Sequence, residues 1–571
     1  MRFFVAMVLA CGALTGVTAA GASLQVRAGT VVQPGAKQAV DALLADAVTD
    51  PKGAGMALAV YQGGRLVYAK GAGLANLETA TPITPQTIFH VASVSKQFTA
   101  FAIALLAREG KLDLDAQVRT YLSYMPDFGT PITVRNLLQH TSGLRDQWML
   151  MTLAGLDTRN VISQQHLVNL VKHQRRLNFP PGTRYQYSNT GYTLLAEIVR
   201  QVSGKSLRQF TSERIFKPLG MTRTFFYDDV TEVVPGRAQS YYRRDGHWTR
   251  ALLNFDNAGA TSLFTTVEDL AKWAGNFAHP TVGDARLIEQ ITTSGRLKDG
   301  SPLNYGFGLR TNQMYAGHRA IMHFGSDAGF RSGFVYIPER DFAVLLTANT
   351  PPADQLRLMQ QVVDVYLNSA GSRLPQPAAE IKLDAATVAA ATGSYRGRYG
   401  RLTWLVPHGA GLALRTLFSE TPLTFRADGT FELTPRNWTY YRAFRLLRGK
   451  DGSVSGIEVT EPAMHEVETL RRADPAKPSA ADLAALTGDY RSAELDVTYT
   501  LTVEHGALVA HAMRIDEPMV FAPSTRDRFD SRMAVIEFVR DATGRANGFK
   551  LHSTGVNDVQ FDRSCSRCVA P

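Results

Sequence analysis

The segment FHVASVSKQFTAFAIALLA, from Phe89 to Ala107, places a polar turn directly before a long apolar helix pattern that stops near Gly110. Ser93 falls at the expected N-terminus of this helix and Lys96 lies one turn later, so that both side chains share one helix face. A serine hydroxyl is a poor nucleophile unless a base takes its proton, and a partly buried lysine can be that base. The helix N-terminus also offers backbone N–H groups to an oxyanion. The alternative is an N-cap serine beside a surface lysine, which the pattern favours when it is taken alone.

A second candidate element is Tyr187-Ser188-Asn189, in the loop FPPGTRYQYSNTGY before another helix pattern. The phenol can relay protons, and the amide can orient a lysine and hold a substrate carbonyl. The same Tyr-x-Asn spacing recurs at Tyr366-Leu367-Asn368, which we interpret as a core residue and a helix end. The spacing alone therefore does not single out Tyr187.

The third candidate element is His323-Phe324-Gly325, the only His-x-Gly in the chain, which lies just before the strand pattern FRSGFVYIP. A small residue at 325 lets a substrate approach the edge of the strand. His323 can donate a hydrogen bond to a substrate carboxylate or carbonyl. The alternative is a structural histidine whose hydrogen bonds are satisfied within the protein.

Together, Ser-x-x-Lys, Tyr-x-Asn and His-x-Gly, in this order, resemble the class C β-lactamases and the penicillin-binding-protein-like serine hydrolases; a related motif set marks the class A enzymes. The resemblance covers roughly residues 36–370 and includes four longer blocks. These are LLQHTSGL (137–144), YSNTGYTLLAEIV (187–199), IFKPLGM (215–221) and TSLFTTVEDLAKW (261–273). It implies a catalytic domain in which an α/β (α+β) antiparallel sheet and a helical lobe enclose the site.

The resemblance also implies a role for each motif residue. Ser93 would be the acylated nucleophile, and Lys96 and Tyr187 would form the proton-shuttling network. Asn189 would steady Lys96 and the substrate. The strand that carries His323 would form one wall of the cleft.

On that wall, Gly325 and Ser326 follow His323, and the backbone N–H groups of Ser93 and Ser326 would form the oxyanion hole. No metal or organic cofactor is implied. The β-lactamase motif begins with a lysine that grips the substrate carboxylate, whereas an imidazole with the ordinary pKa of about 6.5 is mostly neutral at pH 7. The histidine form is similar to that of related D-aminopeptidases, D-amino acid amidases and esterases.

Hydrophobic and turn patterns predict the order of elements around these motifs. Residues 36–48 and 352–368 read as helices, and strand pairs are expected at Gly63-Gly64 and around Pro338-Glu339-Arg340. A helix and hairpin at one end, with a hairpin and helix at the other, predict that both ends meet in one antiparallel sheet. The helical middle of the sequence would pack beside that sheet.

After residue 370 the sequence changes to short β-like segments. Prolines mark two linkers, at 375–377 and near 476. A five-residue sequence also recurs after 95 residues: Thr392-Gly393-Ser394-Tyr395-Arg396 returns as Thr487-Gly488-Asp489-Tyr490-Arg491. This repeat predicts two related antiparallel β-barrel modules, at 378–473 and 479–571. D-aminopeptidases of the resembled family carry two such barrels.

Residues 1–22 fit a secretory signal, with Arg2, the apolar run FFVAMVLA and a small-residue cleavage site at Ala20-Gly21-Ala22. We therefore expect an exported, periplasmic or secreted protein; a lipid anchor at Cys11 fits less well. Cys565 and Cys568 remain for a terminal disulfide or no role. The net charge of +10 is spread along the chain, which does not favour a nucleic-acid partner.

The length of 571 residues thus divides into a signal, a catalytic domain at 36–370 and two β modules. The predicted function is an exported serine hydrolase that acts through a Ser93 acyl-enzyme on amide or ester bonds. Its partner would be a small-molecule or peptide substrate, with peptidoglycan-derived and D-amino-acid-containing compounds among the candidates, and no membrane span. The alternatives are a β-lactamase and a non-catalytic penicillin-binding or peptidoglycan-recognition protein.

Overall fold

The computed structural model describes nine stretches of the chain. They are residues 35–157, 160–352, 354–367, 378–397, 402–415, 420–433, 443–450, 453–461 and 466–564. The expected signal at 1–22, with Cys11, the prolines at 375–377 and the Cys565-Cys568 pair lie outside the described residues. In the described stretches, no helix combines the length and the apolar character needed to cross a membrane.

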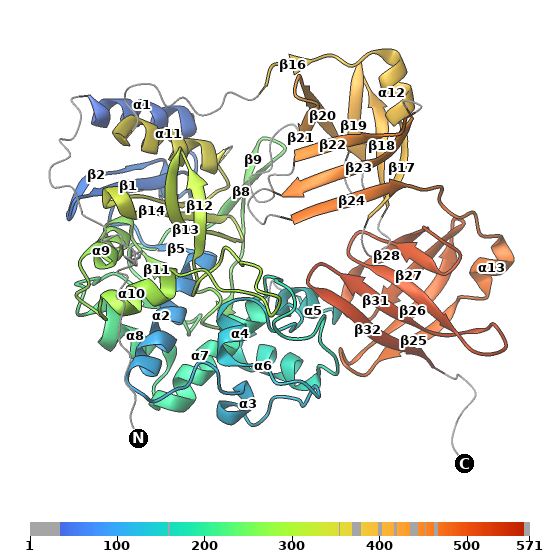
Figure 1. Ribbon diagram of the computed structural model, residues 1–571, viewed down its shortest axis with the longest axis horizontal. Helices are drawn as coiled ribbons and strands as arrows, with labels where there is room; N and C mark the ends of the chain where they lie inside the picture. The colour runs from blue at the N-terminus through green and yellow to red at the C-terminus, as the bar shows by residue number, and fades with distance from the viewer. Residues whose placement is uncertain are drawn as a thin grey trace, which may run out of the picture.

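The two ends of the catalytic region meet in one six-stranded antiparallel sheet, as the sequence predicts (Figure 1). In spatial order its strands are β12 (Arg310–Tyr315), β13 (His318–Asp327), β14 (Phe330–Ile337), β15 (Phe342–Ala348), β1 (Met56–Gln62) and β2 (Arg65–Ala72). The early strand β1 pairs in antiparallel register with the late strand β15, from Met56 opposite Ala348 to Gln62 opposite Phe342. The expected hairpins β1–β2 and β14–β15 are confirmed.

Both faces of this sheet are covered. Along β1 the side chains alternate between two cores: Ala57 and Ala59 belong to one, and Leu58 and Val60 to the other. Helices α1 (Ala36–Ala47) and α11 (Gln355–Leu367) cover the second face (Figure 1), where Tyr366 packs against Phe342. Helix α9 (Val267–Ala278) packs on the first face. A strand with side chains buried on both faces is therefore apolar throughout.

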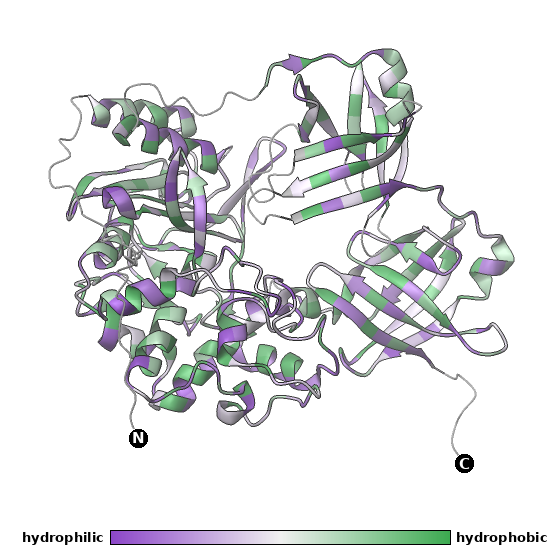
Figure 2. Cartoon of the chain, viewed as in Figure 1, coloured by the Kyte–Doolittle hydropathy of each residue, from purple (hydrophilic) through white to green (hydrophobic). Residues whose placement is uncertain are grey.

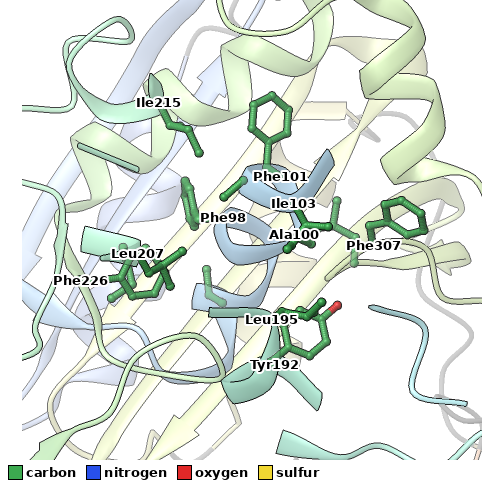
Figure 3. Packing of buried hydrophobic residues seen from close by; sticks show 14 of the residues in the cluster. Phe98, Ala100, Phe101, Ile103, Tyr192, Leu195, Leu207, Ile215, Phe226 and Phe307 are labelled. Carbon is green, nitrogen blue, oxygen red and sulfur yellow. The ribbon is translucent and has the colours of Figure 1, made fainter. Parts of the chain in front are cut away.

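Helix α2 (Ser95–Arg108) lies at the centre of the first core. Its side chains from Ser95 to Leu106 are all buried, including the polar side chains of Lys96, Gln97 and Thr99. The rings of Phe98 and Phe101 lie 4.6 and 5.1 Å from Trp273, and Figure 3 shows both pointing into the cluster. The core therefore fixes the helix that directly follows the turn with the candidate nucleophile.

The middle of the chain is mainly helical and packs beside the sheet, again as expected. Its helices are α3 (Val118–Tyr121), α4 (Val134–Leu138), α5 (Gln147–Leu153), α6 (Gln164–His173), α7 (Asn189–Ser203), α8 (Leu207–Thr211) and α10 (Ala285–Thr292). Helix α7 contacts α2, and its first residue belongs to the second motif. The lobe thus places the Tyr-x-Asn motif against the start of α2.

Two closed eight-stranded barrels follow, which confirms the two β modules; the module boundaries stay a prediction. The first contains β17 (Gly393–Arg396), β18 (Leu402–His408), β19 (Gly411–Arg415), β20 (Glu420–Arg426), β21 (Thr430–Leu433), β22 (Ala443–Arg448), β23 (Val454–Glu461) and β24 (Glu466–Arg472). The second contains β25 (Gly488–Ser492), β26 (Val497–Glu504), β27 (Ala507–Ala512), β28 (Ile515–Pro523), β29 (Arg528–Asp530), β30 (Val535–Arg540), β31 (Ala546–Ser553) and β32 (Val556–Arg563). Hydrophobic and hydrophilic residues alternate along their strands (Figure 2). Alternation of this kind fills a barrel interior and leaves the outer face polar.

The repeated Tyr-Arg sequence has the same local structure in both barrels. The hydroxyl of Tyr395 donates to the carbonyl oxygen of Ala391 at 2.5 Å, and that of Tyr490 donates to Leu486 at 2.9 Å. Each bond reaches back four residues, and the two copies are 95 positions apart. The tyrosine therefore ties the turn before each barrel to its first strand.

The second barrel packs on the helical lobe, and the two share one hydrophobic cluster. The buried Arg145 forms an ion pair with Glu494, and its guanidinium also donates to the backbone oxygens of Asn557 and Asp558. The Tyr499 hydroxyl donates to the carbonyl oxygen of Leu153, at the end of α5, at 2.7 Å. Figure 1 shows the barrel beside α5.

Candidate active site

The turn before α2 determines which of its serines faces the site. A 3-10 turn (η1, Ala92–Val94) precedes the α-helix, so Ser93 lies in this turn and the α-helix begins at Ser95, two residues later than expected. The hydroxyl of Ser95 donates to the Ala92 carbonyl oxygen and accepts from the Leu263 N–H. Ser95 is thus used to hold the turn.

Lys96 reaches back over the turn to Ser93. Its Nζ lies 3.0 Å from Ser93 Oγ, 2.9 Å from Asn189 Oδ1 and 2.7 Å from the carbonyl oxygen of Ala260. The Lys96 side chain is fully buried. Burial lowers its pKa to about 7, although the nearby carboxylates of Asp146 and Asp327 act in the opposite direction.

The orientation of the Asn189 amide is fixed by Asp146. Asp146 Oδ2 accepts from the Asn189 backbone N–H at 2.8 Å and from Asn189 Nδ2 at 2.9 Å. Because the amide nitrogen is committed to Asp146, the amide oxygen faces Lys96. Asp146 is in turn held by the second barrel, since its backbone N–H donates to the Gly555 carbonyl oxygen at 2.9 Å.

Tyr187 lies over the same group of side chains. Lys96 Nζ is 4.9 Å from the centre of its ring, and its hydroxyl hydrogen bonds to Ser93. Burial raises the pKa of the Tyr187 phenol well above its ordinary value, so the phenol keeps its proton at neutral pH. Its ring also stacks near His140, with centroids 4.3 Å apart.

The third motif lies on β13. His323 is buried, its ring centroid is 6.3 Å from that of Tyr187, and its Nε2 lies 3.1 Å from the Tyr305 hydroxyl. Burial, reinforced by the charges of Lys96 and Arg310, lowers the pKa of the His323 imidazole to about 3. Ser326 is exposed near the end of the strand and pairs with Arg331 of β14.

Gly325 permits a close approach between β13 and the turn that carries Ser93. A Cβ at this position would lie 2.3 Å from both the Val91 carbonyl oxygen and Ser332 Oγ. The sequence suggested that a small residue here gives room to a substrate. In the structure, any side chain at position 325 would also push β13 away from the turn that carries Ser93.

The structure thus brings Ser93, Lys96, Tyr187, Asn189 and His323 together, with Gly325 and Ser326 on the adjoining strand. Sequence reasoning missed Asp146 and Tyr305. Asp146 lies two positions after the LLQHTSGL block, which is the only local signal that pointed to it. In the described part of the chain, no group of three His, Cys, Asp or Glu side chains is placed to hold a metal ion.

The sheet and the helical lobe meet at the Ser93–Lys96 pair, in which a buried amine lies beside a serine hydroxyl. A model of the Beta-lactamase family matches residues 40–366, which is more than half of the 571 residues. The chain therefore belongs to the Beta-lactamase family.

Among known proteins, the chain is similar to two D-aminopeptidases. It is 28% identical to that of Gluconobacter oxydans (strain 621H) over 310 residues, which cover 54% of this chain and 58% of the relative. It is 30% identical to that of Brucella canis (strain ATCC 23365 / NCTC 10854 / RM-666) over 286 residues, which cover 49% of this chain and 53% of the relative. The chain thus matches little more than half the length of these relatives.

Solved structures share the fold. The octameric penicillin-binding protein homologue from Pyrococcus abyssi aligns with a TM-score of 0.54 and 24% identity, over 76% of this chain and 99% of its own. The D-amino acid amidase from Ochrobactrum anthropi SV3 aligns with a TM-score of 0.50 and 24% identity, over 59% of this chain and 99% of its own. At this identity the likeness concerns the fold alone.

Proposed function

We propose that the chain is an exported serine hydrolase that forms an acyl-enzyme on Ser93 and cleaves amide or ester bonds, with D-amino-acid-containing peptides and small esters as substrates. The observation that carries this proposal is the buried Lys96 Nζ at 3.0 Å from Ser93 Oγ. The likeness to D-aminopeptidases supports the substrate class, and the pattern of residues 1–22 supports export.

The three oxygen neighbours of Lys96 Nζ fit both of its proton states. A charged ammonium has three N–H groups and can donate to all three oxygens. A neutral amine has two N–H groups, which suit Asn189 Oδ1 and the Ala260 carbonyl because both can only accept. Its lone pair then points to Ser93 Oγ and can take the serine proton. Proton transfer therefore needs no rearrangement of the lysine.

In the proposed reaction, Ser93 Oγ bonds to the substrate carbonyl carbon as its proton moves to Lys96. The carbonyl electrons move to oxygen, and the N–H groups of Ser93 and Ser326 are proposed to bind that oxyanion. The proton then reaches the leaving nitrogen or oxygen through Tyr187, whose raised pKa keeps it a donor. When the leaving group departs, water attacks the ester on Ser93 by the same proton route in reverse.

A substrate panel tests the substrate class. With D- and L-amino acid p-nitroanilides, short-chain p-nitrophenyl esters and nitrocefin, we expect the D-amino acid anilides or the esters to have the highest kcat/KM. Neutral His323 gives the third motif no cation for a β-lactam carboxylate, so nitrocefin should be poor. Nitrocefin as the best substrate would contradict the proposed ranking.

The pH dependence tests the role of Lys96. Because the base must be neutral, kcat/KM should rise with pH through about 7, the pKa of buried Lys96. The Asp327 carboxylate raises that pKa, so Asp327→Asn should shift this acidic limb to lower pH. The surface change Glu289→Gln, which also removes one negative charge, should leave the limb in place. If the acidic limb of the pH profile moves in neither variant, the titration that limits kcat/KM is not that of Lys96.

A further inference from the structure

A chain of hydrogen bonds runs behind the candidate site through three buried side chains. The Tyr305 hydroxyl lies 3.2 Å from His140 Nε2 and 3.1 Å from His323 Nε2, so a single phenol joins both imidazoles. All three side chains are at most 3% exposed. Bulk water does not reach any of these three side chains. Each of their hydrogen-bond donors and acceptors must therefore find its partner within the protein.

The proton on His140 can be placed from its partners. The backbone N–H of Ser188 donates to His140 Nδ1 at 3.1 Å, so this nitrogen carries no proton. Burial, with the charge of Lys96, holds the pKa of His140 well below its ordinary value. The neutral ring therefore carries its proton on Nε2 and donates it to the Tyr305 oxygen.

His323 has the opposite pattern. Its Nδ1 lies 2.8 Å from the carbonyl oxygen of Phe324, which can only accept, so the His323 proton is on Nδ1. In the neutral ring Nε2 is then an acceptor, and it takes the Tyr305 proton. Tyr192 lies beside this group but donates its own proton to the Leu138 carbonyl oxygen at 2.7 Å.

We propose that Tyr305 is a positioning residue that holds His323 of the third motif as the neutral tautomer protonated on Nδ1, and that the site consequently favours substrates whose acyl group carries no carboxylate. Both ring nitrogens of His323 are bonded within the protein, so no imidazole N–H is left for a substrate. The sequence suggested that His323 donates a hydrogen bond to the substrate. The two hydrogen bonds within the protein do not favour that role.

The surroundings of His323 favour the uncharged ring. The charged or titratable groups that face it are Lys96, Arg310, Tyr187, Tyr305 and His140. The cationic forms of Lys96 and Arg310 would both repel an imidazolium, and none of these neighbours is a carboxylate. The wall of the cleft thus carries a neutral ring where related lactamases have a lysine.

The inference about the substrate's acyl group rests on the proposed Ser93 acyl-enzyme. The assignment of the His323 tautomer does not depend on that proposal. The 15N resonances of the His323 imidazole, assigned by their loss in His323→Asn, should show a protonated Nδ1 and a pyridine-type Nε2 at pH 7. In Tyr305→Phe, where Nε2 no longer accepts a hydrogen bond, the two nitrogen resonances should move toward each other, as expected when both neutral tautomers are populated. A protonated Nε2 in the wild-type protein would overturn the proposal.

The matching kinetic test uses two esters of similar size, p-nitrophenyl butyrate and p-nitrophenyl hemisuccinate. We expect the wild-type KM for the anionic hemisuccinate to be at least about tenfold the KM for the neutral ester, because His323 has no N–H to offer the carboxylate that is desolvated beside it. In Tyr305→Phe, in which part of the His323 population would carry its proton on Nε2, this ratio should fall severalfold. Equal wild-type KM values would contradict the substrate part.

The control is Tyr499→Phe, which removes a buried hydroxyl that donates to a backbone oxygen far from His323. It should leave the His323 resonances and the KM ratio unchanged. If Tyr305→Phe does not fold, the nitrogen resonances of the wild-type protein still decide the tautomer. If neither ester is hydrolysed, the proposed function fails while the tautomer assignment can still hold.

Discussion

Replacing Ser93 with alanine should abolish turnover, with kcat/KM reduced by at least about 10,000-fold, because loss of the nucleophile removes the covalent route. The fold should be retained, since the Ser93 side chain is not what holds the turn: Ser95 bonds to Ala92 and Leu263 instead. Labelling by a fluorophosphonate or fluorescent penicillin probe, followed by mass spectrometry of the modified peptide, measures the effect directly.

The matched control is Ser123→Ala, which changes an exposed serine and should label like the wild-type protein. A wild-type protein that labels no more than Ser93→Ala would contradict the acyl-enzyme and favour a non-catalytic penicillin-binding role. Labelling retained in Ser93→Ala but lost in Ser95→Ala would reassign the nucleophile.

The second large effect concerns stability. Glu494→Gln should lower the free energy of unfolding by about 3–5 kcal/mol, because it leaves the buried Arg145 without a counter-charge. Both side chains are almost completely buried, at 0% and 6% exposure, so water cannot replace the lost charge. The measurement is the urea midpoint of the transition in which the barrel separates from the helical lobe.

The Arg119–Asp127 pair serves as the comparison, since its side chains are 46% and 68% exposed. Asp127→Asn should leave the midpoint unchanged, as removal of a solvated pair does. Equal midpoints for Glu494→Gln and the wild-type protein would contradict this expectation and show that hydrogen bonds to the backbone oxygens of Asn557 and Asp558 are enough to stabilise the buried Arg145 charge.

The sequence predicted the parts of the site that are encoded at short range. Ser93 and Lys96 are three residues apart on adjoining turns, and Tyr187 and Asn189 are two residues apart at the start of α7. Within each pair, the short separation along the chain largely determines the distance between the two side chains. The five-residue repeat predicted two related β modules, and in both barrels its tyrosine donates the same hydrogen bond four residues back along the chain.

The parts that could not be predicted are brought in by tertiary contacts. Asp146 acts on Asn189 across 43 positions, and Glu494 pairs with Arg145 across 349, so no local pattern links either pair. The reason for a glycine at 325 also lies in tertiary packing, against Val91 and Ser332. The tautomer of His323 depends on Tyr305, a single residue in a segment without a motif.

Because Gly555 anchors Asp146, the candidate site depends on a part of the chain that is synthesised long after the three motifs. Gly555 lies in the turn between β31 and β32, the last two strands among the described residues. During synthesis all three motifs leave the ribosome long before this turn exists, so a nascent or shortened chain lacks the carbonyl that anchors Asp146 beside Asn189. The proposed hydrolytic activity would therefore depend on the turn between β31 and β32 as well as on the three motifs, and its appearance would report that the second barrel has been made and folded.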